Sequence, residues 1–271
     1  MLGHCTSAGL SVCVTHHKTM RVCIFLLLLC AGASWALICR QVAGRMKQID
    51  TSNGQVFAVD LRGNVFTRRG EVWARVPGNL GHVTVGAAGV WGVGRDQKVY
   101  KLVDGSWAIM AGLLKQIDGG GNQIIAGVNA GNNVFCSNKR DTVRAAHFFT
   151  PVYKHIRGKM KYYSCGSHTC WGVNPSGYIY CRLHVKPVFC LGSHWLRVNG
   201  RFRMVEVGTD GTVYAIDLHW RVFRRVGISA ARPQGIRWVH LNFIGRRFRH
   251  VTADLGTLWL VELNGNLIRC Q

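Results

Sequence analysis

The sequence predicts an all-β chain that folds as a six-bladed β-propeller, with its N-terminal and C-terminal strands sharing one blade. Three observations lead to this fold. A glycine-centred motif recurs six times, short strand-like segments follow each copy, and nothing shows the 3.6-residue period of an amphipathic helix. The chain also has 33 glycines and only 5 prolines, which indicates many tight turns.

The first 36 residues have the pattern of a secretory signal peptide. Arg21 precedes the apolar run 24–29, and the small residues Ser34 and Ala36 precede a cleavage site after residue 36. Met20 would open a signal of ordinary length, so it is either the true start or residues 1–19 extend the basic region. The apolar run is far shorter than the roughly 20 residues of a membrane span, and we expect no transmembrane segment. Residues 37–271 are then the secreted domain.

The repeat is centred on glycines spaced 34 to 46 residues apart. They are Gly44, Gly78, Gly112, Gly158, Gly200 and Gly245. An aromatic residue, such as Trp73 or Trp107, stands five positions before four of them. Cys39 takes this position in the first copy, and Trp238 stands seven positions before the last glycine. A spacing kept this well indicates one structural unit repeated around a ring.

A second block follows each glycine and completes the four strands of a blade. It reads VFAVD at 56–60, VWGVG at 90–94, IAGVN at 125–129, CWGVN at 170–174, VYAID at 213–217 and LWLVE at 258–262. An aromatic or aliphatic residue returns nine positions after the second member of every block. These segments are rich in valine and aromatics and are bounded by Gly, Asn and Asp, as expected of strands and tight turns. The longer intervals carry insertions at 137–150, 183–193, 226–237 and 241–244, which we expect in loops.

Seven cysteines remain after the predicted cleavage, which in a secreted chain indicates disulfides. Cys39 and Cys270 lie at opposite ends of one inferred blade, so a bridge between them would close the ring. Cys165 and Cys170 flank a hairpin-sized loop, and Cys181 and Cys190 flank an insertion. These spacings favour the pairs Cys39–Cys270, Cys165–Cys170 and Cys181–Cys190, with Cys136 left over, although spacing alone does not fix connectivity.

Three stretches closely resemble the tectonin repeats of fish-egg lectins. They read GRMKQIDTSNGQVFAVD from residue 44, GLLKQIDGGGNQ from residue 112 and KYYSCGSHTCWGVN from residue 161. The resemblance covers essentially all of 37–271. It implies a secreted six-bladed propeller that binds N-acetylated sugars and bacterial lipopolysaccharide, in some members with bound calcium. The sequence departs from the repeat at Gly94 and Glu262, which replace Asn or Asp, and at Ala126, which replaces an aromatic.

Four polar residues end the second block of their repeats and are candidates for contact with sugar hydroxyls. They are Asp60, Asn129, Asn174 and Asp217. The same positions are also typical of Asx turns that cap a strand. The aromatic residues Trp91, Trp171, Tyr214 and Trp259 are candidates for stacking on sugar rings. Their recurrence in nearly every repeat instead favours the core between blades.

A further set recurs six or seven residues after each glycine. It comprises Asp50, Thr84, Asp118, Ser164, Glu206 and Thr252. If the strand that carries these residues is the innermost strand of each blade, their side chains form a polar ring at the propeller axis. The ring would hold either a cation through oxygen ligands or a set of structural hydrogen bonds, and with three carboxylates among six the second is favoured.

The last third of the chain is strongly basic, with twelve Arg and no Lys from residue 197 onward against five acids. We select Arg224, Arg225, Arg246, Arg247 and Arg249 as an anion patch. Guanidinium groups bind phosphate and sulfate by paired hydrogen bonds, and Phe243 and Phe248 would meet acyl chains. The patch would bind the phosphates of lipopolysaccharide or a sulfated glycan, or else it is a solvated basic face.

These features predict a non-enzymatic, secreted lectin of innate defence that agglutinates microbes through surface glycans and lipopolysaccharide. No HExxH, zinc spacing or GxSxG motif is present, so we expect no catalysis and no cofactor apart from the calcium that the resemblance allows. The alternative is a cationic structural or matrix protein that binds sulfated glycans or nucleic acid by charge. The net charge of +22, or +20 without Lys18 and Arg21 of the leader, suits both functions. The sequence leaves the oligomeric state open.

Overall fold

The structure is a computed structural model that describes residues 37–271. The predicted signal peptide, residues 1–36 with the alternative start Met20, lies outside the described residues. Within residues 37–271, no helix has the length and apolar composition that a membrane span requires. More than half of the residues in this part of the chain lie in strands, and it has one short helix, α1 (Lys139–Arg144).

The strands follow one another along the whole described chain. They are β1 (Cys39–Arg45), β2 (Gln48–Ser52), β3 (Gln55–Val59), β4 (Asn64–Arg69), β5 (Val72–Asn79), β6 (His82–Gly86), β7 (Gly89–Val93), β8 (Lys98–Val103), β9 (Ser106–Leu113), β10 (Gln116–Asp118), β11 (Ile125–Val128), β12 (Asn133–Ser137), β13 (Lys154–Lys159), β14 (Tyr162–Cys165), β15 (Cys170–Val173), β16 (Tyr178–Arg182), β17 (Trp195–Val207), β18 (Val213–Asp217), β19 (Val222–Val226), β20 (Arg237–Leu241), β21 (Phe248–Asp254), β22 (Thr257–Glu262) and β23 (Asn266–Cys270).

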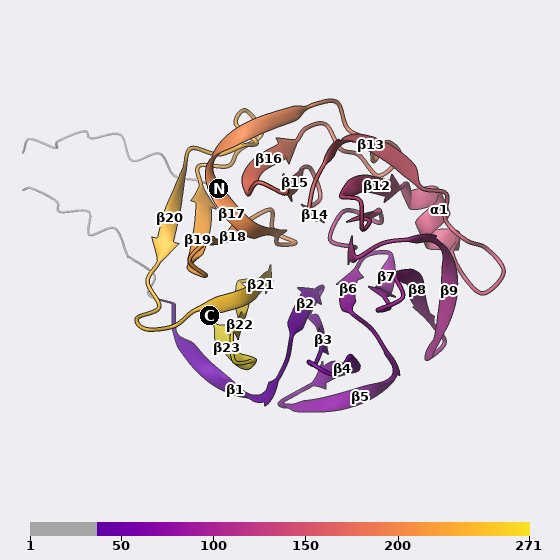
Figure 1. The fold of residues 1–271 in the computed structure, drawn as a ribbon, viewed down its shortest axis with the longest axis horizontal. Helices are drawn as coiled ribbons and strands as arrows, with labels where there is room; N and C mark the ends of the chain where they lie inside the picture. Colours follow the sequence, from indigo (N-terminus) through magenta and orange to yellow (C-terminus); the bar gives the residue numbers. More distant parts are fainter. Residues whose placement is uncertain (1–36) are drawn as a thin grey trace, which may run out of the picture. The chain divides into compact units, whose positions relative to one another are not determined.

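The strands pair into four four-stranded sheets and one seven-stranded sheet. The large sheet arises because β17 is long: residues 195–201 pair with β16, and residues 202–207 pair with β18. Dividing β17 at this point gives six antiparallel units of four strands. We call them blade 1 (β2–β5), blade 2 (β6–β9), blade 3 (β10–β13), blade 4 (β14 to the first part of β17), blade 5 (the second part of β17 to β20) and blade 6 (β21–β23 with β1). Figure 1 shows these blades arranged as sectors of a ring.

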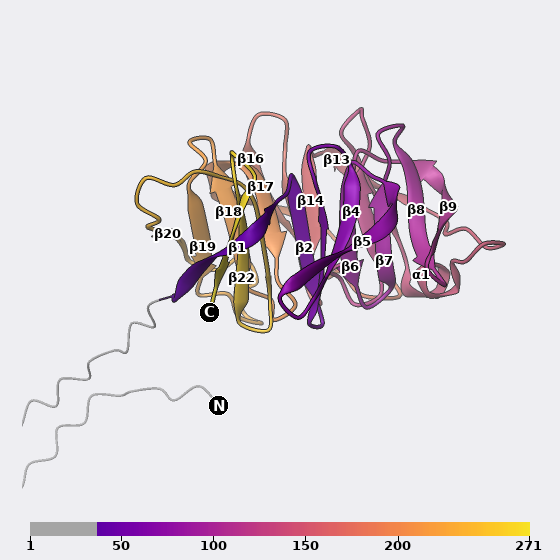
Figure 2. The same cartoon turned by 90° about the horizontal axis from the view of Figure 1, so that it is seen from below.

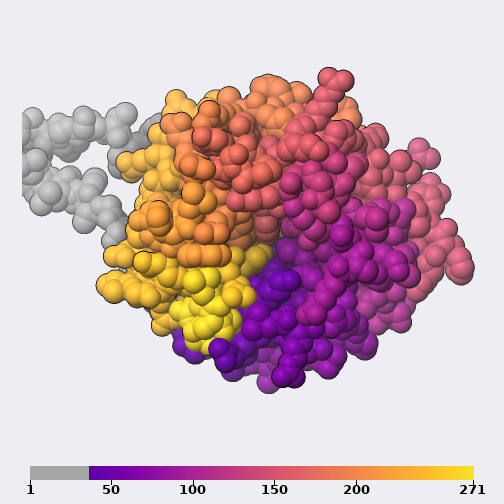
Figure 3. Space-filling view, in the orientation of Figure 1, coloured from indigo at the N-terminus to yellow at the C-terminus, as the bar shows by residue number. Residues whose placement is uncertain are grey.

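The ring closes inside blade 6, as the sequence predicts. β1 pairs with β23, with Cys39 opposite Cys270 and Val42 opposite Leu267. The C-terminal segment therefore lies against the N-terminal one in the space-filling view (Figure 3). From the side, the outer strands β1 and β5 lie across the near rim of the ring (Figure 2).

The recurring glycine and tryptophan lock the outer strands of neighbouring blades together. The Trp107 indole Nε1 donates to the Pro77 carbonyl of blade 1 at 2.6 Å, so the ring lies directly over Gly78. A Cβ added at Gly78, whose φ is +120°, would come within 2.6 Å of that indole nitrogen. Glycine is needed here both for its backbone conformation and for the close approach of the ring. Trp73, Trp195 and Trp238 make the same donation to Ala43, Arg157 and Asn199.

The core consists of apolar clusters between adjacent blades. One cluster packs Val93, Val99 and Met110 of blade 2 against Ile117 and Ile125 of blade 3. Each of these side chains is at most 3% exposed. Alternate residues of the strands face the neighbouring blades, so the core follows the ring.

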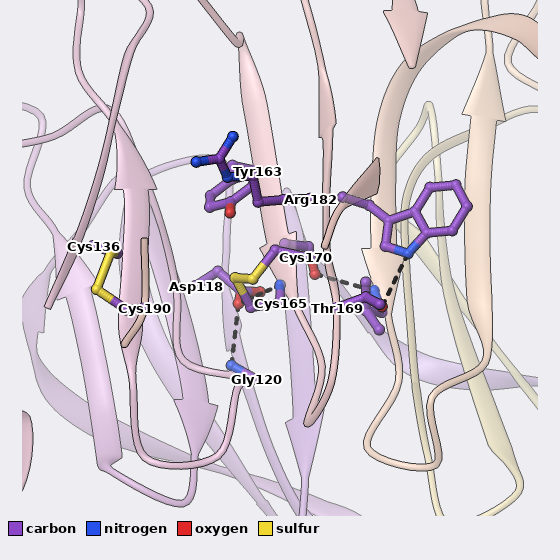
Figure 4. Close-up of a disulfide and its surroundings, with 12 residues drawn as sticks. Asp118, Gly120, Cys136, Tyr163, Cys165, Thr169, Cys170, Arg182 and Cys190 are labelled. Atoms are coloured by element: carbon purple, nitrogen blue, oxygen red, sulfur yellow. Dashed lines mark hydrogen bonds between the residues drawn. A yellow bond between two sulfur atoms is a disulfide. The ribbon is translucent and has the colours of Figure 1, made fainter. Parts of the chain in front are cut away.

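Three disulfides are present within residues 37–271, and one of them differs from the prediction. Cys39–Cys270 and Cys165–Cys170 form as expected. The predicted pair Cys181–Cys190 is wrong, because Cys190 bonds to Cys136. Cys181 is the one free thiol in the described part of the chain, and it is buried inside β16. The Cys136–Cys190 bridge joins blade 3 to the insertion of blade 4, a contact across blades that sequence spacing does not reveal (Figure 4).

Candidate functional site

The residues predicted to contact sugars form tight turns in four different blades. In blade 1, the Asp60 carboxylate accepts the backbone N–H groups of Arg62 and Asn64 and the Asn64 side-chain amide, all at 2.8 Å. Burial alone would raise the pKa of Asp60, but the hydrogen bonds from Asn64 and Arg62 outweigh it and lower the pKa. Asn129, Asn174 and Asp217 accept the N–H four positions further on in the same way. These oxygens thus serve as Asx-turn acceptors, the alternative role that the sequence allows.

The two repeats that depart from the pattern keep this turn by another route. Where Gly94 replaces the acid, Asp96 accepts the Lys98 N–H at 3.2 Å. Where Glu262 stands, the Asn264 side chain accepts the Asn266 N–H at 2.9 Å. An acceptor in the turn is therefore retained even when its position changes, which supports a structural role.

The aromatic residues considered for stacking on sugars are buried between blades. Trp91 and Trp171 are fully buried, and Tyr214 and Trp259 are 8% and 3% exposed. They belong to the core clusters rather than to an exposed face. Core packing is therefore the role that the structure gives them.

The five arginines chosen as an anion patch do not form one surface. Arg225 is 7% exposed, and its guanidinium donates to the Gln234 and Gly235 carbonyls at 2.8 and 3.3 Å. Arg224 is exposed near the end of β19 where the blade 5 insertion begins. The segment 246–249 lies at the other end of β19, because the Phe248 N–H bonds to the Trp220 carbonyl just before that strand starts.

The segment 246–249 is partly exposed, but each of its arginines already donates to an oxygen of the protein. Arg246 forms an ion pair with Glu262 at 3.0 Å, and Arg247 donates to the Arg246 carbonyl. The Arg249 guanidinium donates to the Leu263 carbonyl. The expectation that Phe248 meets acyl chains is wrong, because this side chain is 1% exposed and packs in the core.

The polar ring is present around the axis and joins successive blades. Asp50 accepts the Val85 N–H of blade 2 at 2.8 Å, and Thr84 accepts the Gly119 N–H of blade 3 at 2.9 Å. Asp118 and Ser164 continue the pattern into blades 4 and 5. Figure 4 shows Asp118 beside the Cys165–Cys170 bridge of blade 4.

The acidic members of this ring do not fit the calcium that the resemblance allows. Calcium takes roughly six to eight oxygen ligands. The carboxylate oxygens of Asp50 instead face N–H and O–H donors, including the Thr84 hydroxyl at 2.7 Å. Among residues 37–271, no three His, Cys, Asp or Glu side chains are grouped to hold a metal ion.

Burial of these carboxyl groups favours their protonated forms. Burial raises the pKa of Asp50 to about 6. Burial together with the charge of Asp50 raises the pKa of Asp118 to about 7. Burial and the two aspartates also hold the pKa of Glu206 well above its usual value. The buried His82 and His250 lie nearby, and burial lowers the pKa of His250 to about 3.

A cavity of about 940 Å³ lies between blades 4 and 5 and is the candidate ligand site. Its walls are the β14–β15 hairpin, the turn 210–212, and parts of the insertions 183–193 and 226–237. The lining combines groups that donate or accept hydrogen bonds with apolar surface. The polar groups include Ser167, His168, Thr212 and Arg224, and the apolar surface includes Val185 and Ile228. This mixture is typical of saccharide and small-molecule pockets.

The insertions that line this cavity are held rigidly. The Cys136–Cys190 bridge fixes the blade 4 insertion, and the Asn138 side chain accepts the Cys190 N–H at 2.9 Å. In the blade 5 insertion, Ser229 and Arg232 exchange backbone hydrogen bonds across a tight turn. The sequence locates these insertions as loops but gives no sign that two of them face each other across a pocket. The feature of the sequence that could have located this site is that consecutive repeats both carry an insertion.

Comparison with known proteins establishes the family. The model of the tectonin domain matches residues 45–263. The chain belongs to the tectonin family. It is 37% identical over 235 residues to a fish-egg lectin of Cyprinus carpio, covering 86% of this chain and 98% of the relative.

Solved structures share the propeller architecture of this tectonin chain. Human WBSCR16 has a TM-score of 0.54 at 13% identity, covering 86% of this chain and 72% of that one. YCF48 from Cyanidioschyzon merolae has a TM-score of 0.53 at 13% identity, covering 86% and 84%. At such low identity these similarities show the fold alone.

Proposed function

We propose that this tectonin protein is a secreted lectin that binds N-acetylated sugars and bacterial lipopolysaccharide and agglutinates microbes in innate defence. The cavity between blades 4 and 5 is the observation that carries the proposal. It offers hydroxyl, imidazole and guanidinium groups beside apolar surface, and its walls are fixed by a disulfide. The relationship to a fish-egg lectin supports binding of glycans rather than catalysis.

Within the cavity, each class of lining group has a separate task. The Ser167 and Thr212 hydroxyls are suited to the hydroxyl and acetamido groups of a neutral sugar. Val185 and Ile228 provide surface for the acetamido methyl group. Arg224 is exposed and supplies a guanidinium for a phosphate of lipopolysaccharide. The exposed Arg246 and Arg247 are a second candidate contact for phosphate, at the far end of β19.

The proposal is tested by titrating chitotetraose and lipopolysaccharide into the protein at low and high salt. Arg224→Gln should weaken lipopolysaccharide binding about tenfold and change chitotetraose binding little, because a neutral sugar has no charge to lose. Arg62→Gln removes the same charge from the exposed β3–β4 turn and serves as the control. Reversal of Arg246, Arg247 and Arg249 to Glu measures the second contact.

The alternative function is charge-driven binding of sulfated glycans or nucleic acid by a matrix protein. The net charge of +22 favours it as a second candidate. Such binding falls steeply with salt and does not distinguish Arg224→Gln from Arg62→Gln. Failure of free N-acetylglucosamine to compete, together with that salt dependence, would replace the lectin proposal by the alternative.

A further inference from the structure

Three blades carry an arginine at the same position of their third strand. Each of these arginines pairs across the sheet with the outer tryptophan of its own blade, and its guanidinium lies 5.2 to 5.3 Å from the centre of that indole ring. The pairs are Arg68–Trp73 in blade 1, Arg182–Trp195 in blade 4 and Arg225–Trp238 in blade 5. The three sites therefore differ mainly in what lies on the other side of the guanidinium.

In blades 4 and 5, the insertion loops supply oxygen atoms to this arginine. The Arg182 Nε donates to the Leu191 carbonyl at 2.8 Å. The Arg225 guanidinium donates to the Gln234 carbonyl at 2.8 Å and also to that of Gly235. The guanidinium at this position is thus held between an indole ring and the carbonyl oxygens of a loop.

Blade 1 has the arginine but lacks the loop. Only two residues, Gly70 and Glu71, connect β4 to β5, so no insertion carbonyl covers Arg68. The Arg68 side chain is 5% exposed, and its Nη1 has no hydrogen-bond partner among residues 37–271. The Arg269 Nε of blade 6 is likewise buried and without a partner in this part of the chain.

In blade 1 the Glu71 carboxylate, rather than a loop carbonyl, is the acceptor for Arg68. It accepts hydrogen bonds from Arg68 at 2.7 Å and Arg40 at 2.9 Å, and it lies 3.6 Å from Arg269. Three guanidinium groups therefore share one carboxylate, and with the Asp254 carboxylate of the same cavity included, positive charges still outnumber negative ones by one. The Glu71 side chain is 64% exposed on a two-residue turn, so its displacement costs little.

These groups line a cavity of about 440 Å³ between blades 6 and 1, separate from the cavity of blades 4 and 5. Arg68, Arg269 and Glu71 lie on its walls together with Asp254 and Trp259. The Asp254 carboxylate is already satisfied by the Gly54 N–H at 2.7 Å and by the Thr209 hydroxyl. The arginines are therefore the groups in this cavity that an added ligand oxygen would satisfy.

We propose that this cavity binds the oxyanion of an acidic saccharide, and that Glu71 occupies the place of that oxyanion in the free protein. The oxyanion is the carboxylate, sulfate or phosphate group that guanidinium forks bind in common. The ligand displaces Glu71 and takes over its contacts with Arg40, Arg68 and Arg269. This inference rests on the proposed lectin function and adds a second site of different chemical preference.

Because Glu71 competes with the ligand for the arginines, removing its charge should strengthen binding rather than weaken it. Glu71→Gln removes the competing anion and should strengthen binding of an acidic saccharide by about threefold to tenfold. Asp104→Asn changes the total charge equally on the matching two-residue turn of blade 2, between β8 and β9, where Asp104 is exposed and away from the cavity. The probes for isothermal titration are a heparin tetrasaccharide, a hyaluronan tetrasaccharide and a phosphorylated lipopolysaccharide core oligosaccharide, which present mainly sulfate, carboxylate and phosphate. The probe that responds identifies the source of the oxyanion.

A second pair of variants tests the arginines. Arg269→Gln should weaken binding of the responding probe about tenfold, whereas Arg62→Gln, which removes an equal charge from the β3–β4 turn, should not. Thermal unfolding of both variants verifies that the fold is retained, and if Arg269→Gln unfolds, the Glu71 comparison decides alone. Equal effects of Glu71→Gln and Asp104→Asn on all three probes would overturn the inference. Chitotetraose binding, measured in parallel, fails only if the proposed lectin function fails.

Discussion

The interface between blades 5 and 6 is built differently from the other five interfaces of the ring. At those five, an aromatic side chain of one blade covers the glycine motif of the blade before it, as Trp107 covers Gly78. Cys39 takes the aromatic position in blade 6, so this lock is lost between blades 5 and 6. Near the axis, Glu206 is directed to the Tyr162 hydroxyl at 3.4 Å and, within residues 37–271, makes no hydrogen bond to blade 6.

This difference shows how a repeated ring accommodates its closing point. The outer strand of blade 6 is β1, which comes from the other end of the chain, and its cysteine is used for the bridge to Cys270. A tryptophan cannot occupy the same position. Blade 6 therefore lacks the indole contact with blade 5 but keeps an apolar cluster with it, and the covalent bond within blade 6 holds its outer strand. The remaining links to blade 5 include Thr209 with Asp254 and the Phe248–Trp220 backbone bond.

The largest expected loss of unfolding free energy comes from removing the Cys39–Cys270 bridge of blade 6. The double variant Cys39→Ser and Cys270→Ser opens a loop with a sequence separation of 231 residues. Chain-entropy arguments give a loss of about 5 kcal/mol for so long a loop. Cys165–Cys170 spans only 5 residues, and its removal should cost about 2 kcal/mol by the same argument.

Urea unfolding of both double variants measures this contrast. Circular dichroism should retain the β-sheet signature in each, because the strand pairs remain. Equal losses of unfolding free energy would show that closure of blade 6 does not depend on its disulfide.

A substitution of glycine by alanine should separate the locked interfaces from the unlocked one. Gly78→Ala places a Cβ 2.6 Å from the Trp107 nitrogen at a φ of +120°, and we expect a loss of about 3 kcal/mol. Gly245→Ala occupies the matching motif in blade 5, where φ is +70° and an added Cβ meets no described atom within 4 Å. This change should cost about 1 kcal/mol, the strain of the left-handed conformation alone.

Thermal or urea denaturation of the two alanine variants compares the interfaces directly. A loss at Gly245 as large as that at Gly78 would contradict the distinction, since it would mean that the blade 5 motif is packed as tightly as the others.

The sequence predicts most of this fold because the residues of the repeat are those that the local structure of each blade requires. Gly78 must be glycine because Trp107 lies over it, and both residues recur at a fixed spacing. The six units and the shared last blade could therefore be inferred from spacing alone. The Cys136–Cys190 bridge could not, because it depends on how two insertions meet across a blade interface.

The candidate sites were much less predictable than the fold. Asp60 and Asp217 stand at a position that recurs along the chain, and in the structure the residues at this position form turns. The cavity between blades 4 and 5 is formed by insertions that the first two repeats lack, so the motif shared by all six repeats does not indicate it. The uncovered arginine of blade 1 differs from those of blades 4 and 5 only through the loop that it lacks, so a search for shared motifs does not detect it.

The smallest expected change in unfolding free energy comes from the charge of Glu206, near the interface between blades 5 and 6. Burial and the charges of Asp118 and Asp50 hold the pKa of Glu206 well above its usual value, so the folded state binds a proton more tightly than the unfolded state does. Stability from this proton is complete below the unfolded pKa and declines as pH rises toward the folded pKa. Glu206→Gln removes the titrating group and should raise the unfolding free energy by about 1 kcal/mol at pH 8, with little gain at pH 5.

A pH series of denaturation curves for the wild type, Glu206→Gln and Asp118→Asn completes the comparison. Between pH 8 and pH 6.5 the wild type should gain stability, because Asp118, with a pKa of about 7, takes up its proton in this range. Below pH 6.5 the buried His82 and His250 oppose further gain, since burial lowers the pKa of each and protonation then favours unfolding. Asp118 also receives the Cys165 N–H of blade 4, and Glu206 receives the Tyr162 hydroxyl of blade 4, so each variant also alters one hydrogen bond between blades. A Glu206→Gln variant that loses stability at pH 8 would contradict this prediction, since it would mean that the hydrogen bond from Tyr162 to the carboxylate outweighs the cost of its burial.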